Sequence, residues 1–105
     1  LEEWRWVGSR LGELTPAGAV QLGEGIADKI KQCKDADGKR RTLLRFLDMM
    51  ALSVRLRLRG GKVTPCCASG SLAVLWQAGE RLAANVRPEL VAYSAALDTV
   101  AALRA

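Results

Sequence analysis

The segment from Lys39 to Arg59 limits the possible folds of this chain more than any other feature, because its apolar residues recur at helical spacing. One broad arc of the predicted helix holds Leu43, Leu44, Phe46, Leu47, Met50, Ala51, Val54 and Leu58. A second, separate arc holds Met49, Leu52 and Leu56. Such a helix is either central in its own domain or shares the second arc with another protein, and the sequence leaves both alternatives open.

Four further segments show apolar residues at helical spacing. We therefore predict an all-α fold, a compact bundle of about five helices forming a single domain over residues 1–105. The predicted helices span residues 1 to about 13, 16 to about 34, 39–59, 72 to about 84 and 88 to about 104. Residues 60–70 have no period and are rich in turn formers, so we expect a loop there, followed by Ser71 as a helix cap.

Proline and hydroxyl or amide residues mark several predicted helix ends. Thr15 precedes Pro16, which gives a hydroxyl cap followed by a proline at the first helical position. A continuous helix through Pro88 would cost about 3 kcal/mol, so a new helix is expected to start there. Asn85 tolerates the left-handed conformation that ends helices, and the chain is therefore expected to turn a corner between Asn85 and Pro88.

The second predicted helix contains Gly18, Gly23 and Gly25, each of which costs about 1 kcal/mol relative to alanine. Gly23 lies near the apolar stripe and would allow another helix to approach closely. A weak surface helix is the alternative. The charged segment after this helix offers Asp35 or Asp37 as the N-cap of the third predicted helix.

Apolar residues also define the expected buried faces of the last two helices. The first face comprises Leu72, Leu75, Trp76, Ala78, Leu82 and Ala83. The second comprises Leu90, Tyr93, Leu97, Val100 and Ala101. Trp4, Trp6 and Trp76 are interpreted as core or boundary residues. Arg57 projects into the apolar arc of its helix, so we expect its stem to be buried and its charged head to reach water.

The net charge of +5 is unevenly distributed along the chain. Eight basic and two acidic residues lie between Asp37 and Lys62, giving +6, so the remainder carries −1. One arc of the central helix holds Arg41, Arg45, Arg55 and Arg59, with Asp48 as the single acidic residue among them. This candidate basic face could be a solvated surface, could neutralise phosphates of a nucleic acid, or could pair with acidic residues of a partner.

The sequence lacks the residues that several classes of functional site require. The chain has no histidine, which removes Ser-His and Cys-His nucleophile pairs. Its three cysteines lack a fourth ligand for zinc, and their spacing fits no zinc pattern. Cys33 and the adjacent Cys66 and Cys67 form no disulfide or metal pattern and are expected to be reduced thiols of a cytoplasmic protein. The segment GGK follows a helix and is no phosphate-binding loop. We expect no catalytic residue, cofactor, metal, small-molecule substrate or membrane span.

The order of elements resembles a known family. A glycine- and alanine-rich helix, a charged reset, the segment LLRFLDMMALSVRLRLRGG, a loop, and then LWQAGERLAANVRPELVAYSAALDTVAAL follow one another. This order is similar to that of the C-terminal helical domains of bacterial DNA polymerase III clamp-loader subunits, particularly the delta-prime type. Asn85, Val86 and Pro88 match the family's Asn-Val-Asn-Pro corner, and Arg87 stands where the family has its second asparagine.

The resemblance covers about residues 16–104 and implies a collar domain, which joins five subunits into a ring. Separate ATPase-type domains of the family bind nucleotide, clamp and DNA, so a collar domain is non-catalytic although its parent belongs to a DNA polymerase holoenzyme. The chain would be the C-terminal fragment of a longer protein, with other clamp-loader subunits as partners. Met49, Leu52 and Leu56 then become the candidate protein interface.

Two alternatives from other classes remain open at this point. The chain could be a small helical nucleic-acid-binding module that uses the face from Arg41 to Arg59, although no cluster of aromatic residues for base stacking accompanies it. It could also be an unrelated helical adaptor that binds proteins.

Overall fold

The computed structural model describes residues 2–83 and 87–104, and within these ranges the chain forms five helices and no strand. The helices are α1 (Glu2–Gly12), α2 (Pro16–Lys31), α3 (Ala36–Arg59), α4 (Pro65–Ala83) and α5 (Pro88–Arg104). The predicted all-α bundle of about five helices is confirmed.

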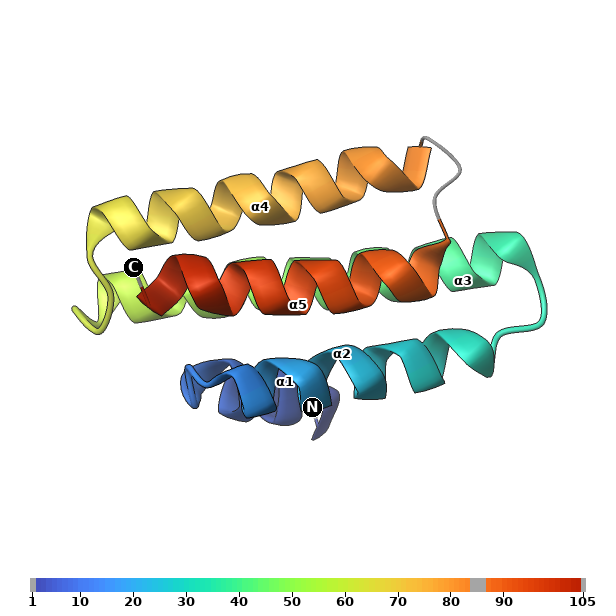
Figure 1. The fold of residues 1–105 in the computed structure, drawn as a ribbon, viewed down its shortest axis with the longest axis horizontal. Helices are drawn as coiled ribbons and strands as arrows, with labels where there is room; N and C mark the ends of the chain where they lie inside the picture. Colours follow the sequence, from blue (N-terminus) through green and yellow to red (C-terminus); the bar gives the residue numbers. More distant parts are fainter. Residues whose placement is uncertain (1, 84–86, 105) are drawn as a thin grey trace.

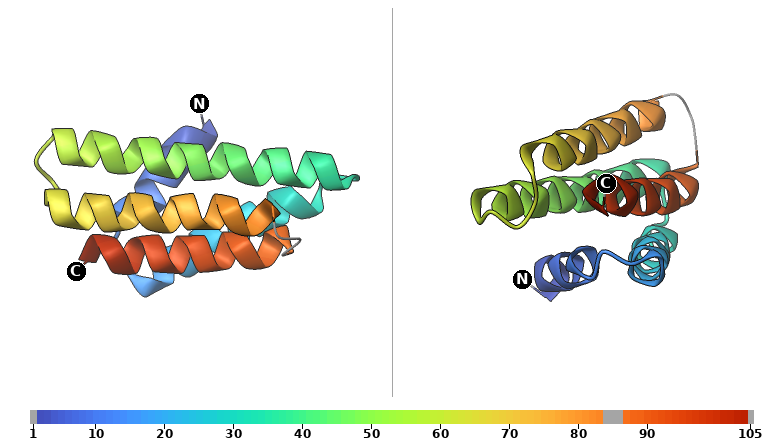
Figure 2. Two further views of the ribbon diagram at one scale, coloured as in Figure 1. Left: turned by 90° about the horizontal axis from the view of Figure 1, so that it is seen from above. Right: turned by 60° about the vertical axis from the view of Figure 1, so that its left-hand side comes forward.

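The helices pack in three layers (Figure 1). Helices α3 and α5 form the middle layer, α4 covers one side of it, and α1 and α2 cover the other side (Figure 2). The helices from α2 to α5 run in alternating directions along the bundle. The core lies between the layers, and its largest fully buried side chains include Phe46, Leu11, Leu22, Ile26, Leu43 and Met50.

Three helices begin with a side-chain cap. The side-chain oxygens of Thr15, Asp35 and Thr64 each accept a hydrogen bond from the amide three residues later, at 3.0, 3.1 and 3.2 Å. Each bond satisfies one of the amides that lack a partner in the first turn of a helix. Pro16 and Pro65 follow two of these caps at the first helical position. The cap at Thr15 is confirmed. Of the two residues predicted as alternatives for the next cap, Asp35 is the one that caps α3.

The predicted loop over residues 60–70 is too long, because α4 already begins at Pro65. Ser71 is therefore no cap: it is buried inside α4, and its hydroxyl donates to the carbonyl of Cys67 at 2.7 Å. The prediction failed because the first turns of α4 lack an apolar period. The Thr64 cap and the burial of Ala68 stabilise these turns instead.

Helix α5 begins at Pro88, as predicted, whereas Asn85 lies outside the described residues. Its predicted buried face is wrong in part, since Leu90 and Leu97 are 57% and 41% exposed and Ala101 is exposed. The buried residues of this helix are Val91, Ala92, Ala95, Ala96, Thr99, Val100 and Leu103. Because α5 packs against both α2 and α4, most of its buried positions are alanines and valines, and Leu90 and Leu97 point outward.

Gly23 allows a close approach of α2 and α5 in this interior. It is buried in α2, and a Cβ atom placed on it would lie 2.9 Å from Cδ1 and 3.1 Å from Cα of Tyr93 in α5. A contact with a backbone atom cannot be relieved by a change of rotamer. The predicted close helix approach at Gly23 is thus confirmed, and the alternative of a weak surface helix is excluded.

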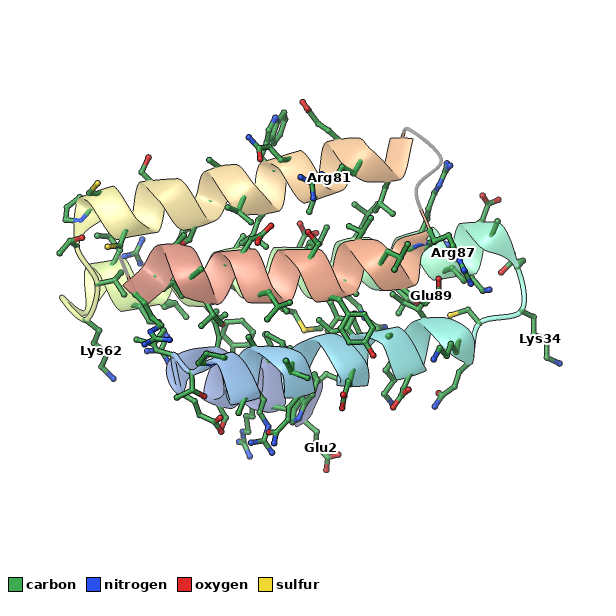
Figure 3. The ribbon with its side chains drawn as sticks, in the orientation of Figure 1. Glu2, Lys34, Lys62, Arg81, Arg87 and Glu89 are labelled. Carbon is green, nitrogen blue, oxygen red and sulfur yellow. The ribbon has the colours of Figure 1, made fainter. Side chains whose placement is uncertain are left out.

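Polar contacts join helices at the surface and at the ends of the bundle. Arg57 donates from Nη2 to the carbonyl of Gly8 in α1 at 3.3 Å, so its head binds α1 instead of reaching freely into water. Lys39 lies 4.0 Å from Glu89, which connects the first turns of α3 and α5. Figure 3 labels Glu89 at the start of α5. Arg81 of α4 donates to the hydroxyl of Ser94 in α5 at 3.1 Å.

We predict that Gly23→Ala destabilises the domain although alanine favours helices. Overpacking against the Tyr93 backbone costs about 1–3 kcal/mol, which outweighs the gain of about 1 kcal/mol in helix propensity. The matched control is Gly70→Ala in α4, whose added Cβ would meet Ala102 at an ordinary 3.9 Å and should raise stability. Urea denaturation measures both variants. Equal stabilisation by both would contradict the close approach of α2 and α5.

Candidate interaction surface

Large apolar side chains are exposed mainly on α3 and α4. Among the described residues seven such side chains are exposed, and four of them lie on these two helices, namely Leu44, Leu52, Leu56 and Trp76. The others are distributed over α2 and α5, namely Val20, Leu90 and Leu97. Contiguous exposed apolar surface on a packed domain indicates an interaction site more strongly than scattered residues do.

The outward face of α3 carries these leucines between arginines. We call this face the α3 ridge, defined by Arg41, Leu44, Arg45, Asp48, Leu52, Arg55, Leu56 and Arg59. All eight residues are exposed. The candidate basic face and two of the three residues of the predicted second arc therefore lie together on a single surface.

Arg45 differs from the other arginines of the α3 ridge. Its Nη2 donates to Oε2 of Glu3 in α1 at 3.0 Å, and its guanidinium carbon lies 5.4 Å from the centre of the Phe46 ring. Within the described part of the chain, Arg41, Arg55 and Arg59 form no ion pair. Three arginines of the ridge thus remain available to a partner, whereas Arg45 helps to hold α1 against α3.

Residues of the predicted interface Met49, Leu52 and Leu56 do not share one environment. Leu52 and Leu56 are 48% and 47% exposed, while Met49 is half-buried and packs against the hydrophobic core. Helical spacing grouped the three correctly on one side of α3. The neighbouring core, which spacing does not show, separates Met49 from the other two.

A groove with a volume of about 710 Å³ separates α3 from α4. Its apolar lining comprises Leu44, Leu47, Ala51, Leu72 and Leu75. Trp76 and Gly79 of α4 line it as well, together with the charged residues Asp48, Arg55 and Glu80. We call the surface lined by these ten residues the α3–α4 groove.

Trp76 was expected in the core or at its boundary, and this prediction is wrong, because 71% of the side chain is exposed. The indole Nε1 donates to Oε1 of Glu80 at 2.9 Å, which fixes the ring beside the α3–α4 groove. On its own helix Trp76 falls at the edge of the apolar face, next to the buried Leu75. Helical spacing cannot distinguish a buried position from an exposed one at that edge.

A second hollow of about 380 Å³ lies between α1, α2 and α3. It is lined by aromatic residues and charges of both signs, namely Glu2, Glu3, Trp6, Asp28, Lys29 and Phe46, with Gly25 and Gln32. Trp6 meets Phe46 edge to face, with ring centres 6.5 Å apart. This contact and the Glu3–Arg45 pair attach α1 to α3.

The cysteines occupy separate environments. Cys66 is exposed and Cys67 half-buried in the first turn of α4, which sequence reasoning had assigned to a loop, and Cys33 lies 3.2 Å from the hydroxyl of Thr42. In residues 2–83 and 87–104, no three Cys, Asp or Glu side chains are grouped to hold a metal ion. Over the same ranges no helix is sufficiently long and apolar to span a bilayer.

Comparisons of the chain with protein-family models, with curated proteins and with solved structures find no match.

We predict different stability effects along the second arc of α3. Met49→Ala removes partly buried packing and should cost about 1–2 kcal/mol, below the value of about 2–5 kcal/mol for a fully buried methionine. Leu52→Ala and Leu56→Ala should each change stability by less than about 1 kcal/mol, since half of each side chain already contacts water. Thermal and urea denaturation measure all three. A large loss at Leu52 and Leu56 would place the arc in the core.

Proposed function

We propose that this chain is a non-catalytic assembly domain, a collar domain of a bacterial DNA polymerase III clamp-loader subunit that acts in the cytoplasm. Two lines of support lead to this proposal. The order of elements and the corner at Pro88 resemble the delta-prime type, and the five-helix bundle has the fold class that this resemblance implies. On this proposal the partners are the other subunits of the clamp loader.

The observation that carries the proposal is the mixed character of the α3 ridge. Leu52 and Leu56 expose about half of their surface although Phe46, Met50 and Val54 on the same helix are fully buried. The domain therefore has a complete core and apolar residues in excess of it. Burying such residues against another protein removes apolar surface from water at about 25 cal/mol per Å². An apolar centre beside arginines is typical of protein–protein interfaces.

Nucleic-acid binding is supported less well by this surface. Phosphate neutralisation would use Arg41, Arg55 and Arg59, but Asp48 and three leucines lie between them. Leucines gain nothing from contact with a phosphate backbone, and Asp48 repels it. Among the residues that the structure describes, Trp76 is the one exposed aromatic residue beside the ridge, whereas stacking of successive bases needs several rings.

The test uses the full-length protein in its source cells, with Leu52→Gln and Leu56→Gln combined. Affinity capture followed by mass spectrometry should recover clamp-loader subunits with the unaltered protein. The double variant should recover at least tenfold less of them, because two polar amides replace the apolar centre of the interface. The corresponding purified complex should lose this subunit on size-exclusion chromatography.

Val20→Gln combined with Leu97→Gln serves as the matched control, because these residues of α2 and α5 are exposed to a similar degree. Capture by this control should stay within twofold of the unaltered protein. Recovery of nucleic acid that falls steeply with salt, without other subunits, would overturn the assembly proposal. Loss with the control alone would move the interface from α3 to the side of α2 and α5.

A further inference from the structure

The charges along the α3 ridge define the kind of partner that it accepts. Arg41, Asp48 and Arg55 follow one another at intervals of seven residues, and Arg59 lies one turn beyond. Residues at this spacing lie on one face of a helix. At a rise of about 1.5 Å per residue, the arginines span about 27 Å, which is the length of roughly five helical turns. The ridge is therefore long enough to contact a whole helix.

A second copy of this chain fits the α3 ridge poorly. In an antiparallel pair of α3 helices centred on Met50, Arg41 would oppose Arg59 and Arg45 would oppose Arg55. In any other register, three arginines without an ion pair and one aspartate on each copy still give each ridge an excess of two positive charges. Juxtaposed like charges cost several kcal/mol across an interface, so self-association is disfavoured.

The α3–α4 groove supplies the apolar complement to these charges. Leu44 and Trp76 are 43% and 71% exposed on its two sides, and Leu72 and Leu75 contribute to its lining from α4. Gly79 leaves space on the α4 side, because nothing lies within 4 Å of the position where its Cβ would be. A groove between two antiparallel helices is the type of surface that receives the apolar stripe of a third helix.

We propose that the α3–α4 groove and the α3 ridge together bind an acidic amphipathic helix of a different protein chain. Leucine-type residues of that helix enter the groove beside Leu44 and Trp76. Its Glu or Asp residues pair with Arg41, Arg55 and Arg59, and the positions facing Asp48 and Glu80 are basic or neutral. This inference rests on the proposed assembly function and specifies the partner's binding segment.

The first experiment uses photo-crosslinking in the full-length protein within its source cells. Leu44→p-benzoylphenylalanine places the reactive ketone in the groove, and Leu97→p-benzoylphenylalanine places it at an outward position of α5 with similar exposure. After irradiation, the crosslinked peptides are sequenced by mass spectrometry. We expect the Leu44 variant alone to label a helical segment of another chain with leucines at spacings of three and four and a net negative charge.

The second experiment tests the role of the charges. Arg41→Glu, Arg55→Glu and Arg59→Glu, combined in the Leu44 variant, should lower the yield of this crosslink at least tenfold. The control combines Lys29→Glu, Lys31→Glu and Lys34→Glu, exposed residues of α2 and the turn after it, which change the net charge equally. Its yield should stay within twofold, because a partner on the ridge responds to local charge and not to the total.

The outcomes separate this inference from the proposed function. Labelling of a second copy of this chain, of a basic segment or of nucleic acid from Leu44 would overturn the inference, as would equal labelling from Leu97 or no labelling. If affinity capture recovers clamp-loader subunits while the Leu44 crosslinking variant labels none of them, the assembly proposal is supported and the groove does not bind the partner helix. If the Leu44 crosslinking variant labels an acidic helix of an unrelated protein, the inference that the groove binds an acidic helix is supported and the collar assignment fails.

Discussion

The close approach of α2 and α5 at Gly23 is the constraint on which the rest of the bundle depends. It lets α5 lie in the middle layer, where the same helix also packs against α4. A larger residue at Gly23 would meet the Tyr93 backbone and separate the two layers. The packing between α2 and α5 would then be lost along both helices, so the absence of a side chain at residue 23 sets the spacing between these two helices.

This arrangement also explains why α3 exposes both leucines and arginines on one face. One side of α3 contributes Phe46, Met50 and Val54 to the core, and α1 covers a further part through the Glu3–Arg45 pair. Helix α4 meets α3 along the α3–α4 groove and does not cover the ridge beyond it. The leucines and arginines that remain alternate along the exposed face of α3, and a partner helix can use both the apolar and the charged residues.

Local signals in the sequence predicted much of the fold. The five helices, the start at Pro88 and the close approach at Gly23 all follow from helical spacing and from the special backbone properties of proline and glycine. The Thr-Pro pair at Thr64 carries the same start signal as the pair at Thr15, yet the turn formers after it concealed the helix. Spacing also placed the arginines on one face of α3.

The spacing of apolar residues along one helix does not predict properties that depend on the neighbouring helices. The exposure of Trp76 and Leu97 depends on which sides of α4 and α5 other helices cover. The difference between Arg45 and the remaining arginines of the ridge depends on the position of Glu3, which lies forty-two residues away. The separation of Met49 from Leu52 has the same origin.

The alanines on the buried face of α5 have a consequence for the entropy of folding. Ala92, Ala95 and Ala96 have no side-chain rotamers to lose when they enter the core, whereas a buried leucine or isoleucine loses about 0.5–1 kcal/mol. These three positions of the helix that lies between two neighbours are thus ordered without loss of side-chain freedom. Leu90 and Leu97, which point outward from the same helix, keep much of their rotational freedom in water.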